Sequence, residues 1–191
     1  MKKLILASSS PRRKQLLEQI GLDFEIDASN IDEIVDPKLN YIEQVELFSL
    51  QKAQATATKY KNAIILAADS MVVINDEVLG KPKDKAHAVQ MLKKISGTKH
   101  MIATGFTLID TDTGKTVTKS TTLSLWFKKL SDAEIEWLID RDQPFDKAGA
   151  YAIQESAAVF IEKFEGDFFG GIGLPLFSLA EELKKFGINI V

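Results

Sequence analysis

The region that most constrains the fold is KHMIATGFTLIDTDTGKTVTKSTTLSLWFKKL, at residues 99–130. It contains two long runs of strand-forming residues around a turn at Asp112–Gly114, which predicts an antiparallel hairpin. Elsewhere, shorter apolar runs alternate with amphipathic helical patterns. This alternation is typical of an α/β fold, and the hairpin makes the expected sheet mixed rather than purely parallel.

The remaining patterns give the expected order of elements. Strands are expected at residues 4–7, 23–29 and 157–164, and residues 62–80 read as strand, break, strand with a turn at Asn75 and Asp76. Helices are expected from Pro11 after a cap at Ser10, from the Asn40–Glu43 cap to about Tyr60, after Asp84, after the Ser131–Glu134 capping box, and from Pro175 to about Lys185. The inward face of the second helix is expected to contain Ile42, Val45, Phe48, Ala53 and Ala57. Residues 142–154 and the glycine-rich stretch 166–175 are expected to be loops.

The length, the net charge and the counts of cysteine and histidine exclude several classes of protein and site. A length of 191 residues suits one domain, residues 1–191, at roughly 100–200 residues per domain. The net charge of −3 gives no overall attraction to nucleic acid or to an anionic membrane. No cysteine is present, and the two histidines are far apart, so thiolate and imidazole zinc sites are not expected. Any metal would be held by carboxylates, which favours Mg²⁺ or Mn²⁺.

No targeting or membrane segment is evident in the pattern. The start, MKKLILASSS, has an apolar stretch of only Leu4–Ala7, short of the ~7–15 residues that a signal peptide needs. The longest apolar run elsewhere, Ala63–Ala68, is far below the ~20 residues of a membrane span. We expect a cytoplasmic protein that does not bind membranes.

The stretch LILASSSPRRKQLL, at residues 4–17, suggests a site for an anion. A strand ends, a serine-rich turn follows, and a helix begins at Pro11. Helix N-termini attract anions, and Arg12 and Arg13 add donors that match phosphate oxygens. The alternative is a capped helix with two solvated arginines.

Three further positions are candidates for chemistry. Asp69 follows an apolar run, so we expect it at the end of a buried strand, where it can accept a proton from water or hold a divalent ion; the alternative is a turn cap. Lys81 lies in the Gly80–Pro82 turn and can act as a point charge for a phosphate. Lys52 lies among small residues of a helix, where a solvated lysine is the ordinary interpretation.

The loop FDKAGAYAIQ is the last candidate. Lys147 and Gln154 flank small residues that let a ligand approach closely, and a glutamine amide can read a base edge. The alternative is a polar surface loop. Neither a phosphate-binding P-loop nor a G-x-S-x-G nucleophile elbow is present, and GGIGLP lacks the context of a dinucleotide fingerprint.

In order along the chain, LASSSPRR, AADS, GKP, ISGTKH with TG, DKAGAYAIQ and GLPL resemble the motifs of the Maf family of nucleoside triphosphate pyrophosphatases. The resemblance spans Leu6–Leu176. It implies an elongated mixed sheet with flanking helices, in two lobes around a cleft, and a homodimer. It also implies a metal-dependent reaction in which water attacks the α-phosphorus of a nucleoside triphosphate and releases pyrophosphate.

The resemblance assigns roles to individual residues. Asp69 corresponds to the general base, and Asp69 with Glu33 to the metal-binding carboxylates. The substrate-binding positions are Ser8, Arg12, Arg13, Glu33, Lys52, Ser70, Lys81, Lys147 and Gln154. Arg12, Ser70 and Gln154 match the branch that acts on dTTP and UTP rather than the branch that prefers 7-methyl-GTP.

One residue and one short segment depart from the family pattern. Ser70 replaces the usual threonine, which keeps the hydroxyl and removes a methyl group. Residues 155–158, Glu-Ser-Ala-Ala, replace a glycine-rich continuation after Gln154, which can alter base selection or rate. Three other functions stay open. The first is a nucleotide-sensing regulator of cell division and septum formation without significant hydrolysis, and the second is a 7-methyl-GTP-type pyrophosphatase. The third is a nucleic-acid-binding protein that uses Arg12–Lys14, which the near-neutral charge disfavours.

Overall fold

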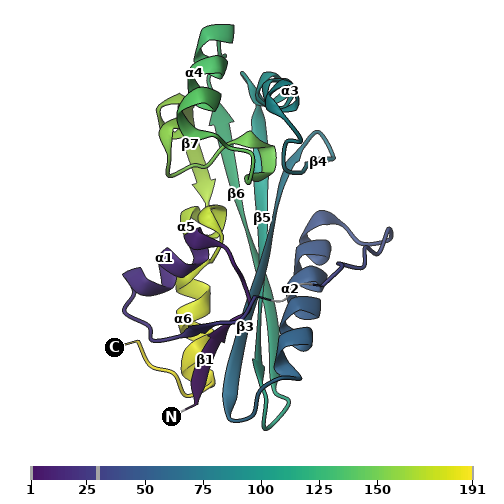
Figure 1. Ribbon diagram of the computed structural model, residues 1–191, viewed down its shortest axis with the longest axis vertical. Helices are drawn as coiled ribbons and strands as arrows, with labels where there is room; N and C mark the ends of the chain where they lie inside the picture. The colour runs from purple at the N-terminus through teal and green to yellow at the C-terminus, as the bar shows by residue number, and fades with distance from the viewer. Residues whose placement is uncertain (1, 29–30, 191) are drawn as a thin grey trace. The chain divides into compact units, whose positions relative to one another are not determined.

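Figure 1 shows a computed structural model of the chain, which describes residues 2–28 and 31–190. Its strands are β1 (Lys3–Leu6), β2 (Glu25–Ile26), β3 (Ala63–Ile74), β4 (Glu77–Leu79), β5 (Lys99–Asp110), β6 (Thr116–Phe127) and β7 (Ile161–Gly166). Its helices are α1 (Pro11–Gln19), α2 (Tyr41–Ala57), α3 (Lys85–Ile95), α4 (Asp132–Asp142), α5 (Phe168–Ile172) and α6 (Leu176–Lys185), with 3₁₀ turns η1 (Ala148–Ala150) and η2 (Ser156–Phe160).

The described strands form one mixed sheet in the order β2-β1-β3-β5-β6-β7, with β4 paired to β3 beside this path. β1 runs parallel to both β2 and β3, whereas β4 is antiparallel to β3 and β7 is antiparallel to β6. The turn between β5 and β6 closes through Gly114, whose N–H donates to the Asp110 carbonyl at 2.9 Å. The predicted mixed α/β fold and its hairpin are therefore confirmed.

The described chain divides into two compact units. The first, unit 1, contains the residues up to Ser70, Thr104–Thr121 and the residues from Gly173; the second, unit 2, contains Met71–Ala103 and Thr122–Ile172. The chain passes from one unit to the other within β3, β5 and β6, which are the long strands of the sheet. The chain therefore crosses between the two units more than once.

Small residues let α2 pack closely against the strands of unit 1. Alternate residues of β1 and β3 point to one face of the sheet. The buried cluster on this face contains Ala53 of α2, Ile109 of β5 and five residues in or next to β1 and β3: Ile5, Ala7, Ala63, Ile65 and Ala67. In β5, a Cβ atom on Gly105 would lie 2.6 Å from the Val45 carbonyl oxygen, so only glycine permits this approach. Figure 1 shows α2 on one side of these strands and α1 with α6 on the other.

The start of α2 is fixed by local chemistry. The Asn40 side chain accepts hydrogen bonds from the N–H groups of Ile42 and Glu43, and Glu43 bonds back to the Asn40 N–H, as the predicted capping box requires. The helix ends at Ala57 rather than Tyr60, because Lys59 and Tyr60 donate to Thr56 and Ala57 in a tighter turn. The prediction of Ile42 on the inward face was wrong: it lies in the first turn and is 38% exposed.

In unit 2, α3 and α4 follow the predicted pattern. Asp84 caps α3, and Ser131 with Glu134 forms the capping box of α4. Their apolar stripes join the unit's core, which includes Leu92, Ile95, Leu138 and Ile139. Within residues 2–28 and 31–190, every helix is too short or too polar to cross a membrane.

Two segments differ from the prediction. The first half of the expected strand 157–164 is the 3₁₀ turn η2, because the Ser156 N–H is anchored by Asp142 at 3.1 Å and the Ala158 N–H donates to the Glu155 carbonyl. The glycine-rich stretch expected to be a loop contains the short helix α5. The Asp167 carboxylate accepts the Gly170 N–H at 2.8 Å and so caps a helix that its glycines alone do not favour.

Candidate active site

The centre of the candidate site is Lys52, which projects from α2 toward two carboxylates. Its ammonium Nζ lies 2.6 Å from an oxygen of Asp69 and 2.6 Å from an oxygen of Glu33. The side chains of Lys52 and Asp69 are only 16% and 15% exposed. Lys52 is therefore not the solvated surface lysine that its sequence context alone suggests.

Asp69 lies inside β3 rather than at a strand end, which corrects the prediction. It is followed by Ser70 and Met71 and then by three buried residues, Val72–Ile74, which pair with β4. This pairing keeps the strand extended beyond the polar positions. The carboxylate is consequently held on the pleat of a central strand, which fixes its direction better than a loop does.

The surroundings of Asp69 shift its acidity in a direction that suits a base. Burial raises the pKa of the Asp69 carboxyl, and the charge of nearby Glu33 raises it further. The positive charges of Lys52 and Arg13 act in the opposite direction, but the pKa stays above its usual value. A carboxylate with a raised pKa accepts a proton from water more readily than an exposed aspartate does.

Arg13 of α1 joins three separate parts of unit 1. Its Nε donates to the Gly173 carbonyl at 3.1 Å, its Nη1 to the Ser8 hydroxyl at 3.0 Å and its Nη2 to the Ser70 hydroxyl at 3.3 Å. Burial lowers the pKa of the Arg13 guanidinium, although an arginine side chain remains charged. Arg13 is thus anchored by the protein through all three nitrogens of its guanidinium.

The turn before α1 is built around Ser8. The buried Ser8 hydroxyl accepts hydrogen bonds from the Ser10 N–H at 3.2 Å and from Arg13. Ser10 occupies the cap position of α1, but within the described residues its side chain forms no capping hydrogen bond, contrary to the prediction. Because no acidic residue lies in the first turn either, the N–H groups of this described helix end have no carboxylate competing for them.

Asp69 and Ser70 are neighbours on one strand and contact side chains of two different helices. Successive side chains of a strand point to opposite faces, and here Asp69 contacts Lys52 of α2 while Ser70 contacts Arg13 of α1. Arg12 is half-buried beside Arg13, and its like charge contributes to the lowered pKa of Arg13. Strand β3 therefore links the two clusters of charge in unit 1.

Gln51 of α2 makes a contact beside Glu33 that the sequence does not reveal. Its side-chain amide donates to the Ile34 carbonyl and accepts the Ile34 N–H, both at 3.0 Å. This double contact fastens the irregular segment after β2 to α2 and holds the neighbouring Glu33 at Lys52. Neither periodicity nor a motif marks such a contact, because it joins a helix side chain to the backbone of a loop.

The other predicted residues lie in unit 2. Lys81 is exposed in the Gly80–Pro82 turn, whose Gly80 carbonyl accepts the Gly149 N–H at 3.0 Å. Lys147 is 8% exposed and contacts Asp146 at 2.9 Å and Glu155 at 3.4 Å, so Glu155, one of the residues that departs from the family pattern, pairs with a predicted substrate residue. Gln154 is exposed. That these three side chains converge with Asp69 stays a prediction.

The carboxylates of unit 1 fit a magnesium or manganese ion whose other ligands are phosphate oxygens and water. Among the described residues, no group of three or more histidine, aspartate or glutamate side chains is arranged to hold a metal. Mg²⁺, however, is commonly bound by one or two carboxylates together with substrate phosphates and water. Asp69 and Glu33, both in contact with Lys52, supply such a pair of carboxylates.

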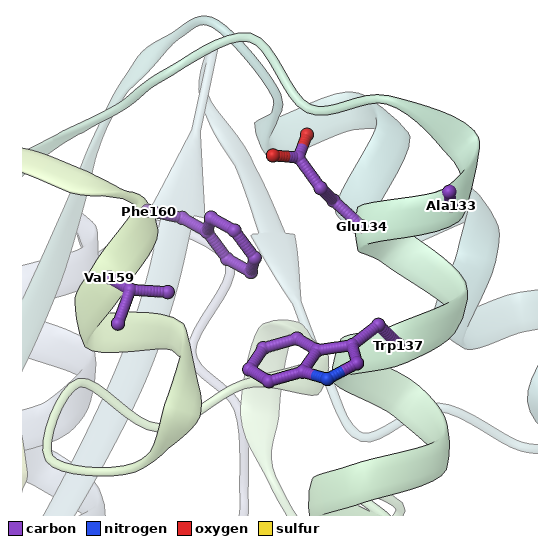
Figure 2. A pocket seen from close by; sticks show the side chains of 5 residues that line it. All are labelled: Ala133, Glu134, Trp137, Val159 and Phe160. Carbon is purple, nitrogen blue, oxygen red and sulfur yellow. The ribbon is translucent and has the colours of Figure 1, made fainter.

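A separate pocket of about 370 Å³ lies in unit 2 between α4 and η2 (Figure 2). Its walls are the side chains of Ala133, Trp137, Val159 and Phe160, with Glu134 also lining it. The Glu134 carboxylate is already bonded to Lys128 and Ser131. An apolar pocket with this lining does not suit a triphosphate, so the chemistry is assigned to the charged cluster of unit 1.

Known proteins resemble this chain over most of its length. The family model described as "Maf-like protein" matches residues 3–186. A "dTTP/UTP pyrophosphatase" of Methanosarcina barkeri is 41% identical over 191 residues, which cover 100% of this chain and 97% of that protein. Another protein of that name, from a Thermoanaerobacter species, is 46% identical over 184 residues, or 96% of each protein. Among solved structures, the Staphylococcus aureus Ham1 protein aligns with a TM-score of 0.48 and 18% identity, over 66% of this chain and 72% of that one. The chain belongs to the Maf-like protein family.

Proposed function

We propose that the protein is a nucleoside triphosphate pyrophosphatase that hydrolyses dTTP and UTP to the monophosphate and pyrophosphate. The observation that carries the proposal is the largely buried Asp69 carboxylate, which has a raised pKa and is held by Lys52 beside Glu33. The names of the full-length relatives, at 41% and 46% identity, support the same substrates.

In the proposed reaction, Asp69 removes a proton from a water molecule that attacks the α-phosphorus. A bond forms between the water oxygen and the α-phosphorus, and the bond from that phosphorus to the bridging oxygen breaks. Pyrophosphate leaves with the bonding electrons. Because phosphoryl transfer depends mostly on positioning and charge neutralisation, the surrounding cations matter as much as the base.

The cations have three proposed roles: binding the phosphates, selecting the base and orienting Asp69. Arg13, anchored by its contacts with Ser8, Ser70 and Gly173, presents positive charge to the phosphates, and Lys52 orients Asp69. We assign Lys81 and Lys147 to the triphosphate, and Arg12, Ser70 and Gln154 to the choice of base. Asp69 and Glu33 would hold a Mg²⁺ or Mn²⁺ ion, which supplies charge neutralisation at the phosphates when bound.

The proposed active form is a homodimer. Size-exclusion chromatography with light scattering checks this assembly: a mass of twice 21.2 kDa supports it, and a monomer with full activity contradicts it.

A screen of canonical and modified nucleoside triphosphates, with pyrophosphate as the readout and with Mg²⁺ or Mn²⁺ present, tests the proposal. We expect pyrophosphate from dTTP and UTP, and ¹⁸O from labelled water in the monophosphate product. Preference for 7-methyl-GTP would place the chain in the other branch of the family. Tight nucleotide binding without product would indicate a sensor instead of an enzyme, and release of orthophosphate alone would exclude attack at the α-phosphorus.

A further inference from the structure

Thr104 of β5 makes a buried contact with the candidate site. Its side chain is completely buried, and its hydroxyl donates a hydrogen bond to the Ser70 hydroxyl oxygen at 2.9 Å. Thr104 stands next to Gly105, the residue against which α2 packs, and points to the other face of the strand. It therefore approaches the site from the side of α1 and Arg13.

The two hydrogen bonds that Ser70 accepts determine what its own hydrogen can do. A serine hydroxyl has two lone pairs and one hydrogen. The Ser70 oxygen accepts from Thr104 at 2.9 Å and from the Arg13 guanidinium at 3.3 Å, so both lone pairs are engaged. Within residues 2–28 and 31–190, the structure gives the Ser70 hydrogen no acceptor. That hydrogen is left to donate to a ligand.

We propose that Thr104 is a positioning residue of the nucleotide site, which fixes Ser70 as a hydrogen-bond donor to a phosphate or base oxygen of the substrate. The inference rests on the proposed function. The Ser8 hydroxyl is held in the same way, since it accepts from the Ser10 N–H and from Arg13. Arg13 thus engages two serine hydroxyls through two of its nitrogens, and Thr104 completes the arrangement at Ser70.

The burial of Thr104 separates this role from a purely structural one. Valine has nearly the same shape as threonine and favours a strand equally well, so Thr104→Val removes the hydroxyl and its hydrogen bond with little change in packing. In the Thr104→Val variant, Ser70 would keep only the bond from Arg13, and its hydroxyl could rotate. A hydroxyl that is no longer oriented binds the transition state less well, although the cations proposed to bind the phosphates are unchanged.

A double-mutant cycle tests the proposal. We expect Thr104→Val to lower kcat/KM for dTTP roughly fivefold to tenfold, as the loss of one oriented hydrogen bond predicts, and Thr104→Ser to retain most of the activity. In the Ser70→Ala background, Thr104→Val should have no further effect on kcat/KM, because the hydroxyl through which it acts is gone. The proposal is overturned if Thr104→Val matches the wild type, or if its effect persists in full in the Ser70→Ala background.

Thr107→Val is the matched control. Thr107 is equally buried in the same strand, but its hydroxyl contacts Ser49 at 2.8 Å and Thr118 at 2.9 Å instead of the site. Both valine variants should lower the melting temperature by similar amounts, and only Thr104→Val should couple to Ser70. An equal coupling of Thr107 to Ser70 would mean that the cycle reports general loosening, and it would count against Thr104.

Binding of a non-hydrolysable dTTP analogue, measured by calorimetry, distinguishes the two proposals. If the wild type binds the analogue but releases no pyrophosphate, the proposed function fails, and the same cycle in Kd decides the role of Thr104. If the wild type is active but the cycle shows no coupling, only the inference about Thr104 fails. If the wild type does not bind the analogue, both fail.

Discussion

The ammonium of Lys52 lies 2.6 Å from the carboxylate of Asp69, although the two residues are separated by the whole of the α2–β3 connection. The charge of Lys52 lowers the pKa of the Asp69 carboxyl and so opposes the rise that burial causes. It also sets the direction in which Asp69 points, because Lys52 is itself carried by a helix whose distance from the sheet is fixed by Gly105. The acidity of Asp69 is thus controlled by residues that can be changed one at a time.

Lys52 and Glu33 should shift the acidic limb of the pH–activity profile in opposite directions. The charge of Lys52 lowers the pKa of Asp69, and the charge of Glu33 raises it. Lys52→Met should therefore raise the pH below which activity is lost, and Glu33→Gln should lower it, on top of any loss of rate. The measurement is kcat/KM for dTTP against pH at saturating metal.

The two variants check each other, because a general loss of structure would shift the acidic limb in the same direction in both variants. Shifts of the same sign, or no shift in either variant, would show that Asp69 does not titrate as the base in this limb. Lys59→Met is a control, because Lys59 pairs with Asp27 at 3.0 Å rather than with Asp69.

Gln51→Leu should weaken activation by the metal. The substitution removes both hydrogen bonds to Ile34, so Glu33 is no longer held at Lys52. We expect the Mg²⁺ or Mn²⁺ concentration for half-maximal activity to rise about tenfold or more, as is typical when a residue that orients a metal ligand is lost. The control is Gln54→Leu on the exposed side of the same helix, and an activation curve unchanged by Gln51→Leu would remove Gln51 from this role.

Gly105→Ala should destabilise unit 1. The new Cβ would lie 2.6 Å from the Val45 carbonyl oxygen and 2.8 Å from the Glu46 nitrogen, and these backbone atoms cannot rotate away. We expect a loss of about 1–3 kcal/mol in the free energy of unfolding by urea, as for other overpacked sites. Gly80→Ala, where the Cβ has no atom within 4 Å, should change it by less than about 0.5 kcal/mol. Equal stability of the two variants would contradict the close packing of α2.

His100 should make the protein sensitive to mild acid. It is buried in unit 2, where its Nε2 shares a hydrogen bond of 2.7 Å with the Tyr151 hydroxyl, and burial lowers the pKa of His100 to about 4. Because the folded pKa lies below the ordinary value of 6.5, the stabilisation by neutral His100 is complete above pH 6.5 and is lost as the pH falls to about 4. The loss across this window is about 3 kcal/mol.

His100→Gln, which can still bond to Tyr151, should flatten this part of the stability curve measured by urea unfolding at several pH values. The paired carboxylates Asp110 and Glu134, whose pKa values are lowered to about 2 from 3.8 and 4.5, lose their stabilisation mainly below pH 4.5, so the slope between pH 6.5 and 4.5 reports His100. A variant as acid-sensitive as the wild type between pH 6.5 and 4 would show that His100 does not titrate there.

The elements predicted from the sequence were those with local causes. The capping boxes at Asn40 and Ser131 each involve residues three apart, so the sequence contains all the partners. The α5 helix was missed because its glycines have low helix propensity, and only the cap from Asp167 compensates. The apolar run before Asp69 predicts a strand end there, whereas pairing with β4 extends the strand beyond Asp69.

The site was predictable where motifs exist and hidden where contacts are distant. Asp69 and Arg13 belong to recognisable motifs, whereas the importance of Lys52 came from family resemblance against its ordinary local context. Gln51 forms two hydrogen bonds with Ile34, and Thr104 forms one with Ser70, and neither contact has a counterpart in spacing or periodicity. Such positioning residues become visible only when the fold brings distant segments together.

The turnover of Asp69→Asn is the most direct test of the account. Pyrophosphate release from dTTP should fall on the order of a hundredfold or more, because the amide cannot accept the proton of the attacking water. Affinity for a non-hydrolysable analogue and the melting temperature should stay close to those of the wild type. Turnover near the wild-type rate, in a variant that is folded and binds nucleotide, would show that Asp69 is not the base.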